Sequence, residues 1–174
     1  ILAATRLWLE RAVIGLNLCP FAKSVFVKKQ VRYALTAATT ADELLAELEK
    51  ELALLADTEA AQLDTTLLIH PQVMTDFLDY HFFLAEAEAL LRNNGYDGVF
   101  QIASLHPQYE FAGSDPDDVA NYTNRAPYPM LHLLRESSID RAVAAFPDAA
   151  DIFERNIETM EKLGHEGWRK LWLG

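Results

Sequence analysis

The stretch TTLLIHP at residues 65–71 is the clearest indication of the fold in this chain of 174 residues. It is a short, continuous apolar run closed by a histidine and a proline, which is typical of a strand buried on both faces of a parallel sheet. A second run, GVFQIASLHP at residues 98–107, ends in the same His-Pro pair. We therefore predict two buried strands that end in equivalent ways.

Helical patterns separate these strands from each other and from an earlier predicted strand at residues 31–38. Thr40 and Glu43 form a capping box, and leucines follow at helical spacing. These leucines are Leu44, Leu45, Leu48, Leu52 and Leu55. Residues 75–94 form a further predicted helix, which ends at the NNG of residues 93–95. The order β-α-β-α-β predicts a small α/β sheet that is at least partly parallel and is wrapped by helices.

The two ends of the chain are predicted to be helical. Residues 2–18 form an apolar helix that ends before Pro20, and PFAKSVF at residues 20–26 begins a second short helix. A long loop follows residue 107, and after it the pattern predicts only helices and a short tail rich in tryptophan. These helices cover about residues 129–137, 138–146 and 148–163.

The composition limits the class of protein. Half of the residues are hydrophobic, which is enough for one domain over residues 1–174 that buries roughly two-thirds of its unfolded surface. No window approaches the ~20 uncharged apolar residues of a membrane helix, and no convincing signal peptide is present. Cys19 is the only cysteine, so no internal disulfide can form, which fits the cytoplasm.

The charge disfavours nucleic acid as a partner, because a net charge of −11 repels phosphate backbones. It is unevenly spread: residues 1–40 carry six Lys or Arg and one Glu, whereas residues 41–100 carry thirteen Asp or Glu. We expect the basic segment to lie against the acidic one or to face an anionic ligand. No Walker loop, dinucleotide fingerprint or G-x-S-x-G elbow occurs, so no particular cofactor is implied.

The two His-Pro pairs place His70 and His106 at the ends of their strands. If both strands run in the same direction, the two histidines lie at the carboxyl edge of the sheet, where open α/β sheets bind their ligands. The following proline holds each histidine in an extended conformation. The alternative is that each histidine only bonds a nearby carbonyl at the end of its strand.

The loop at residues 107–128 is long for a compact domain, and such loops are usually binding loops or lids. Its aromatic rings favour an ordered loop that lines a pocket over a mobile one. These rings belong to Tyr109, Phe111, Tyr122 and Tyr128. The helix predicted to follow, beginning near Tyr128 or Pro129, would direct its free N–H groups past Asn124 and Arg125 and so create an anion site. On that helix Met130, Leu133, Leu134 and Ser137 would form a buried stripe. The opposite side would then carry Tyr128, His132, Arg135 and Glu136.

Four kinds of chemistry are compatible with these residues. In the first, His106 or His132 acts as a general acid or base while Arg125 binds a carboxylate or phosphate. In the second, His70, His106 and His132 bind a divalent metal together with Glu136 or Asp118.

In the third, Cys19 is a nucleophile or redox centre, although burial is the commoner fate of such a cysteine. In the fourth, the acidic helices at residues 41–58 and 76–92 bind a partner protein.

Several blocks of the sequence resemble one known family. They are GLNLCPFA at residues 15–22, HP at 70–71, QIASLHPQYEFAG at 101–113 and NYTNRAPYPMLHLLRE at 121–136. Over nearly its whole length the chain is similar to a bacterial family described as a domain of unknown function, number 1415. The resemblance implies no reaction, but it points to the polar positions within these blocks. They are Cys19, His70, His106, Tyr109, Asn121, Asn124, Arg125, His132, Arg135 and Glu136.

The first kind of chemistry is the one we favour. We expect an enzyme that acts on a small anionic metabolite, with His106 and His132 as acid and base and Arg125 as the anion clamp. A further group of residues would bind the substrate: Asn124, Asn121, Tyr109, Tyr128, Arg135, His70 and Cys19. Metal binding through the histidine cluster and a non-enzymatic binding module are the alternatives.

Overall fold

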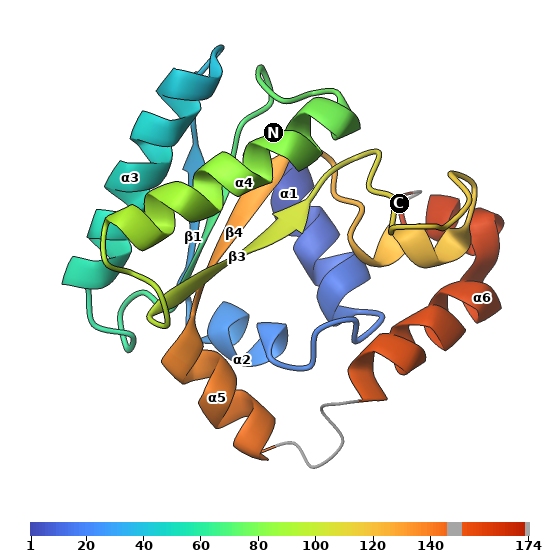
Figure 1. Ribbon diagram of the computed structural model, residues 1–174. Coiled ribbons are helices and arrows are strands. Elements are labelled where there is room, and N and C mark those ends of the chain that lie inside the picture. The colour runs from blue at the N-terminus through green and yellow to red at the C-terminus, as the bar shows by residue number, and fades with distance from the viewer. Residues whose placement is uncertain (146–150, 173–174) are drawn as a thin grey trace.

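The computed structural model describes residues 1–145 and 151–172. It is a mixed α/β fold built on a four-stranded sheet (Figure 1). The strands are β1 (Val31–Leu35), β2 (Thr65–Ile69), β3 (Phe100–Leu105) and β4 (Met130–Arg135). The α-helices are α1 (Leu2–Trp8), α2 (Ala22–Val27), α3 (Ala41–Asp57), α4 (Phe77–Asn93), α5 (Glu136–Ala145) and α6 (Ile152–Lys170). A π-helical segment, η1 (Leu9–Ile14), continues α1, and a 3₁₀ segment, η2 (Val119–Thr123), lies in the long loop.

The sheet has the strand order β1-β2-β4-β3 and is partly parallel, as predicted. β1 pairs with β2 in parallel, whereas β4 is antiparallel to both of its neighbours, β2 and β3. β1, β2 and β3 therefore all run in the same direction. β4 separates the two strands that end in His-Pro, so their carboxyl ends lie at the same edge of the sheet without being adjacent.

The helix predicted at residues 129–137 is wrong, because Met130–Arg135 forms the central strand β4. This strand is covered on both faces, so its sequence MLHLLR is apolar on both sides and lacks the alternation of a half-exposed strand. A six-residue apolar run fits a buried strand and a buried helix equally well. The helix N-terminus expected near Pro129, and the anion site that depended on it, are therefore absent from this place.

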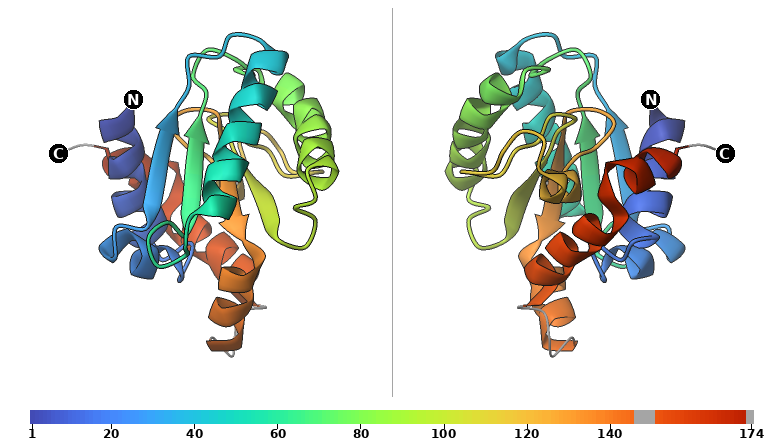
Figure 2. Two further views of the ribbon diagram at one scale, coloured as in Figure 1. Left: turned by 90° about the vertical axis from the view of Figure 1, so that its left-hand side faces the viewer. Right: turned by 90° about the vertical axis from the view of Figure 1, so that its right-hand side faces the viewer.

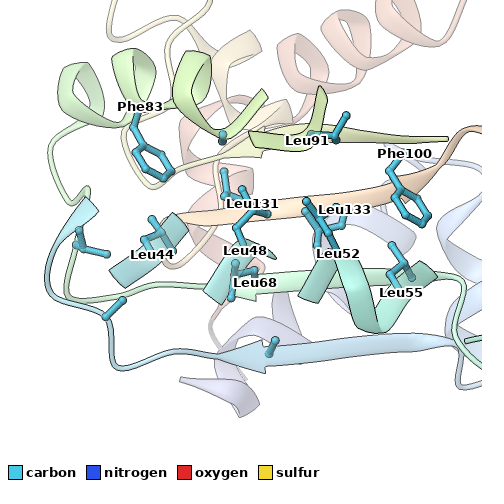
Figure 3. Packing of buried hydrophobic residues seen from close by; sticks show 14 of the residues in the cluster. Leu44, Leu48, Leu52, Leu55, Leu68, Phe83, Leu91, Phe100, Leu131 and Leu133 are labelled. Carbon is cyan, nitrogen blue, oxygen red and sulfur yellow. The ribbon is translucent and has the colours of Figure 1, made fainter. Parts of the chain in front are cut away.

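The helices α3 and α4 cover one face of the sheet (Figure 2). The predicted capping box of α3 is confirmed, because Thr40 Oγ1 accepts a bond from Glu43 N at 3.3 Å and the Glu43 carboxylate accepts one from Thr40 N. Leucines of α3 point at leucines of β2 and β4 (Figure 3). The fully buried members of this core include Leu44, Leu48, Leu52, Leu55, Leu68, Leu131 and Leu133.

The N-terminal segment and α6 lie on the opposite face of the sheet (Figure 2). Trp8 is buried there among residues of β2 and β4, and its Nε1 donates to the Arg125 carbonyl at 3.0 Å. The helix predicted at residues 2–18 is shorter, since its helical turns end at Ile14. None of the helices among residues 1–145 and 151–172 combines the length and the apolar character needed to cross a membrane.

One ion pair joins the basic N-terminal part of the chain to the acidic middle. Both Arg32 Nε and Arg32 Nη2 donate to the Glu51 carboxylate, at 2.6 and 2.9 Å. Glu51 is buried, so the bidentate contact satisfies a carboxylate that would otherwise be costly to remove from water. This contact agrees with the expected placement of the two oppositely charged segments.

Candidate functional site

The residues singled out in the sequence lie in two separate places. His70 and His106 follow β2 and β3 at one edge of the sheet and turn toward α4, where both rings contact Tyr80. His132, in the middle of β4, pairs in register with Leu67 and Ala103 and faces the opposite side of the sheet. The three histidines therefore do not form one cluster.

The two edge histidines are engaged in local hydrogen bonds. His106 Nδ1 accepts from Gln108 N at 3.0 Å, so Nε2 carries the proton and donates to the Met74 carbonyl at 3.2 Å. His70 Nδ1 donates to the Val73 carbonyl at 2.9 Å, and its buried Nε2 has no partner among the described residues. Burial lowers the pKa of His106, and it lowers the pKa of His70 to about 4. Both rings are thus neutral at pH 7 and hold the turns that follow their strands.

Tyr80 closes this edge of the sheet. Its hydroxyl donates to the Met130 carbonyl at 2.8 Å and accepts from Leu105 N at 3.0 Å, which links the adjoining ends of β4 and β3. Burial raises the pKa of Tyr80, so the hydroxyl keeps its proton. The hydroxyl therefore serves to hold the two strand ends together.

Polar side chains of the loop at residues 107–128 hold it together, in addition to the aromatic rings from which the sequence analysis predicted an ordered loop. The buried Asn121 accepts from Phe111 N and Ser114 Oγ, both at 2.9 Å, and donates to the Asp115 carbonyl. Tyr109 packs against the ring of Phe77, 5.3 Å away between centroids. Asn121 and Tyr109 thus stabilise the loop itself.

The two arginines expected to bind an anion both contact backbone carbonyls. Arg125 donates to the carbonyls of Tyr109 and Pro116, at 3.1 and 2.7 Å, and its guanidinium lies over the ring of Tyr122. Arg135 donates to carbonyls at and beyond the end of α3, at distances from 2.5 to 3.2 Å. These carbonyls belong to Leu55, Thr58 and Leu63. Both side chains brace loops in this structure.

A cavity of about 370 Å³ lies against the sheet face that carries His132. This volume is in the range of small-molecule sites, which are mainly apolar with a few directed polar groups. The walls come from the N-terminal helices, the sheet, α5 and α6, and most of the surface is apolar. Polar or charged residues interrupt it: Cys19, Asp64, Thr65, Gln101, Ser104, Thr123, Asn124, His132, Arg135, Ser138 and Asn156.

His132 has a fixed orientation in this cavity. Thr65 Oγ1 donates to the Leu133 carbonyl at 2.6 Å, so its oxygen must accept the second bond, from His132 Nε2 at 2.7 Å. The proton of the neutral ring is therefore on Nε2, and the lone pair is on Nδ1. Nδ1 makes no hydrogen bond within the described chain and is accessible from the cavity. Burial lowers the pKa of His132 to about 4, so at neutral pH the ring presents a hydrogen-bond acceptor to the cavity.

Cys19 lines the same cavity as a free thiol. Burial raises its pKa, while the nearby backbone N–H groups of Phe21 and Ala22 oppose this rise. The thiol is consequently protonated at neutral pH. Asn124 also lines the cavity, and it donates to the Ser104 carbonyl at 3.3 Å.

Of the other candidates, Arg135 also lines the cavity, whereas Tyr128 and Glu136 do not. Tyr128 packs at the margin of the apolar cluster around Trp8, and Glu136 begins α5. No group of three metal-binding side chains comes together within residues 1–145 and 151–172. In particular, the proposed set of His70, His106, His132 and Glu136 is divided between the two sides of the sheet.

Sequence reasoning missed several residues that form the cavity. Thr65 orients His132, Ala103 lies beside it in the sheet, and Asn156 reaches the cavity from α6 while donating to the Leu18 carbonyl. Thr65 is the first residue of the run TTLLIHP. A polar residue in a buried strand was the one sequence feature that could have indicated a role for Thr65. Nothing in the sequence indicated that Asn156 would line the same cavity as residues of β4.

Comparison with known proteins identifies the family of this chain. No curated protein and no solved structure matches the chain. A family model described as "Protein of unknown function (DUF1415)" matches residues 1–170. The chain therefore belongs to this family.

Proposed function

We propose that the protein is an enzyme that binds a small, mainly apolar molecule in the cavity and moves a proton on it through Nδ1 of His132. One observation carries this proposal: a neutral imidazole, held in one tautomer by Thr65, presents its lone pair to a cavity of about 370 Å³. An acid or base must lie within hydrogen-bond reach of the proton that it transfers. Nδ1 is available for such a contact.

The pKa of His132 favours a substrate whose proton loss leaves an anion. The pKa of the His132 ring is about 4 in this structure, which makes the ring a weak base. When the proton moves from the substrate to Nδ1, an imidazolium and a substrate anion form side by side. Each charge stabilises the other in surroundings of low polarity. The imidazolium can then return the proton to another atom of the same molecule, and the ring regains its starting form.

This site differs from the one expected around His106 and Arg125. Both nitrogens of His106 are occupied by backbone groups, and Arg125 contacts two carbonyls. The proposal therefore retains His132 as the acid or base and moves the substrate to the other side of the sheet. Cys19, Gln101 and Asn124 are among the further polar groups available to orient it.

The first test measures binding of an uncharged probe. Titration with 1-octanol should change the nitrogen-15 signals of His132, because the alcohol hydroxyl donates to Nδ1. Ala103→Leu should prevent the change by filling space next to the ring, since Ala103 faces His132 in the sheet. The matched control is Ala85→Leu, because Ala85 is exposed on α4. An unaltered His132 signal in wild type would contradict the proposal.

The second test concerns the chemistry. A set of small apolar ketones and aldehydes is incubated in deuterium oxide with wild type and with His132→Gln. Proton abstraction by Nδ1 should introduce deuterium next to the carbonyl of an accepted compound with the wild-type protein only. Equal incorporation with both proteins would refute the role of His132. Binding to the cavity without any incorporation would favour the second candidate, a binding protein whose His132 only accepts a hydrogen bond.

A further inference from the structure

The cavity adjoins a second, more polar depression of about 590 Å³. The two share a rim formed by α2, α5 and the residue before β2. The shared residues are Phe21, Val25, Asp64, Ser138 and Ala142. The second depression, here called the mouth, therefore adjoins the cavity at these residues.

The mouth carries two cations and one carboxylate among its described lining residues. Lys28, which caps α2, is exposed and makes no ion pair with a described residue. Arg141 of α5 is exposed, and its Nη2 donates to Ser138 Oγ at 2.9 Å. Ser138 in turn donates to the carboxylate of Asp64 at 2.6 Å. The two cations outnumber the single carboxylate, so the mouth keeps a net positive charge.

The sheet register relates His132 to the rim of this mouth. Leu134 pairs with Thr65, which directly follows Asp64 on the rim. His132 precedes Leu134 by two residues in β4, a separation of roughly 7 Å along the strand at about 3.4 Å per residue. A molecule with one end at Lys28 and Arg141 would thus pass Thr65 and present an inner atom to Nδ1 of His132.

We infer that the ligand is an amphipathic molecule with one anionic group, a carboxylate or a phosphate, at Lys28 and Arg141. Its apolar body occupies the cavity, which has room for about a dozen non-hydrogen atoms if each takes ~30 Å³ as water does. This inference rests on the proposed function and names the substrate class for the same cavity. It also places the anionic group, which the sequence suggested, on two cations that the sequence analysis did not single out.

Alkylation of Cys19 provides the test, because Cys19 is the only cysteine and lines the cavity. The rate of reaction with iodoacetamide is measured against octanoate, octyl phosphate and 1-octanol, which share one apolar chain. Shifts of the backbone amide signals of Thr65 and Ala103 give a second, independent measure of the same binding. Variants are Lys28→Gln/Arg141→Gln and, as a control of equal charge change away from the mouth, Lys23→Gln/Lys162→Gln.

In wild type, octanoate or octyl phosphate should protect Cys19 at about two- to fivefold lower concentration than 1-octanol, as for an exposed ion pair. The better of the two anions identifies the head group. The advantage should vanish in Lys28→Gln/Arg141→Gln and persist in Lys23→Gln/Lys162→Gln. Equal binding of all three probes to wild type, or an advantage that survives in the first variant, would overturn the anionic head group while leaving the proposed function intact. If no probe binds by either measure, the proposed function fails as well.

Discussion

Lowering the pH from 7 to 5 should destabilise the protein through two histidines, His70 and His132, that the fold keeps neutral. Burial lowers the pKa of His70 and of His132 to about 4 in the folded chain, against about 6.5 in the unfolded chain. Between these values the unfolded chain binds more protons than the folded one. The stabilisation is thus complete above about pH 6.5 and is lost as the pH falls toward 4.

The magnitude follows from this difference in pKa. At pH 5 an unfolded histidine is almost fully protonated while the buried one is still mostly neutral. At 1.36 kcal/mol per pH unit, each histidine costs about 2 kcal/mol between pH 7 and pH 5. Together His70 and His132 remove about 4 kcal/mol, which is a large part of the 5–15 kcal/mol typical of a domain.

Urea unfolding at the two pH values measures this loss. His70→Asn and His132→Asn should each reduce the loss by about 2 kcal/mol, and the double variant should reduce it by about 4 kcal/mol. Because each comparison is made within one variant, the packing that the substitution itself removes cancels. If His132→Asn keeps the full wild-type loss, His132 is not a neutral, buried imidazole, and the description of the cavity is wrong.

Three further predictions concern single side chains. Arg135→Met should lower the free energy of unfolding by about 2–3 kcal/mol, because it leaves carbonyls at the end of α3 without a donor. An unchanged midpoint of urea unfolding would show that Arg135 does not stabilise these carbonyls. Asn121→Ala should cost about 1–3 kcal/mol and make residues 107–128 more sensitive to limited proteolysis, whereas equal cleavage rates would show that the loop does not depend on this side chain. Thr65→Val removes the acceptor of His132 Nε2–H, so the nitrogen-15 spectrum should show a mixture of tautomers; a single, unchanged tautomer would refute the orienting role of Thr65.

The parts of the fold with strong local signals could be predicted from the sequence. The capping box at Thr40 and the leucine spacing located α3, and the NNG of residues 93–95 located the end of α4. The two His-Pro pairs correctly placed His70 and His106 at one edge of the sheet, since β2 and β3 run in the same direction. Each of these features is encoded by residues that lie close together in the sequence.

The central strand could not be identified in the same way. Its sequence MLHLLR is short and apolar on both sides, and only the sheet around it distinguishes a strand from a helix. Assigning it to a helix placed His132 beside Arg125 and the loop, whereas β4 turns the ring to the other side of the sheet. The error in one element therefore misplaced the whole candidate site.

The cavity itself lies beyond the reach of local patterns. Its polar groups come from segments as distant as Cys19, Thr65, His132 and Asn156, and they meet only when helices from both ends of the chain pack on the sheet. The two arginines show the opposite error. Arg125 and Arg135 are the residue type that binds anions, but in this structure their guanidinium groups donate to backbone carbonyls. Residue type alone does not distinguish an arginine that binds a ligand from one that stabilises a loop through its carbonyls.

The protonation state and contacts of His132 provide the most direct test of the proposed site. Long-range nitrogen-15 spectra of the histidine rings are recorded at pH 7, with and without saturating octanoate or 1-octanol. Without ligand, His132 should show a proton on Nε2 and a free lone pair on Nδ1; on binding, the Nδ1 signal should move while those of His70 and His106 stay in place. A ligand-induced change confined to His70 and His106, with His132 unaffected, would contradict the account and return the site to the edge of the sheet.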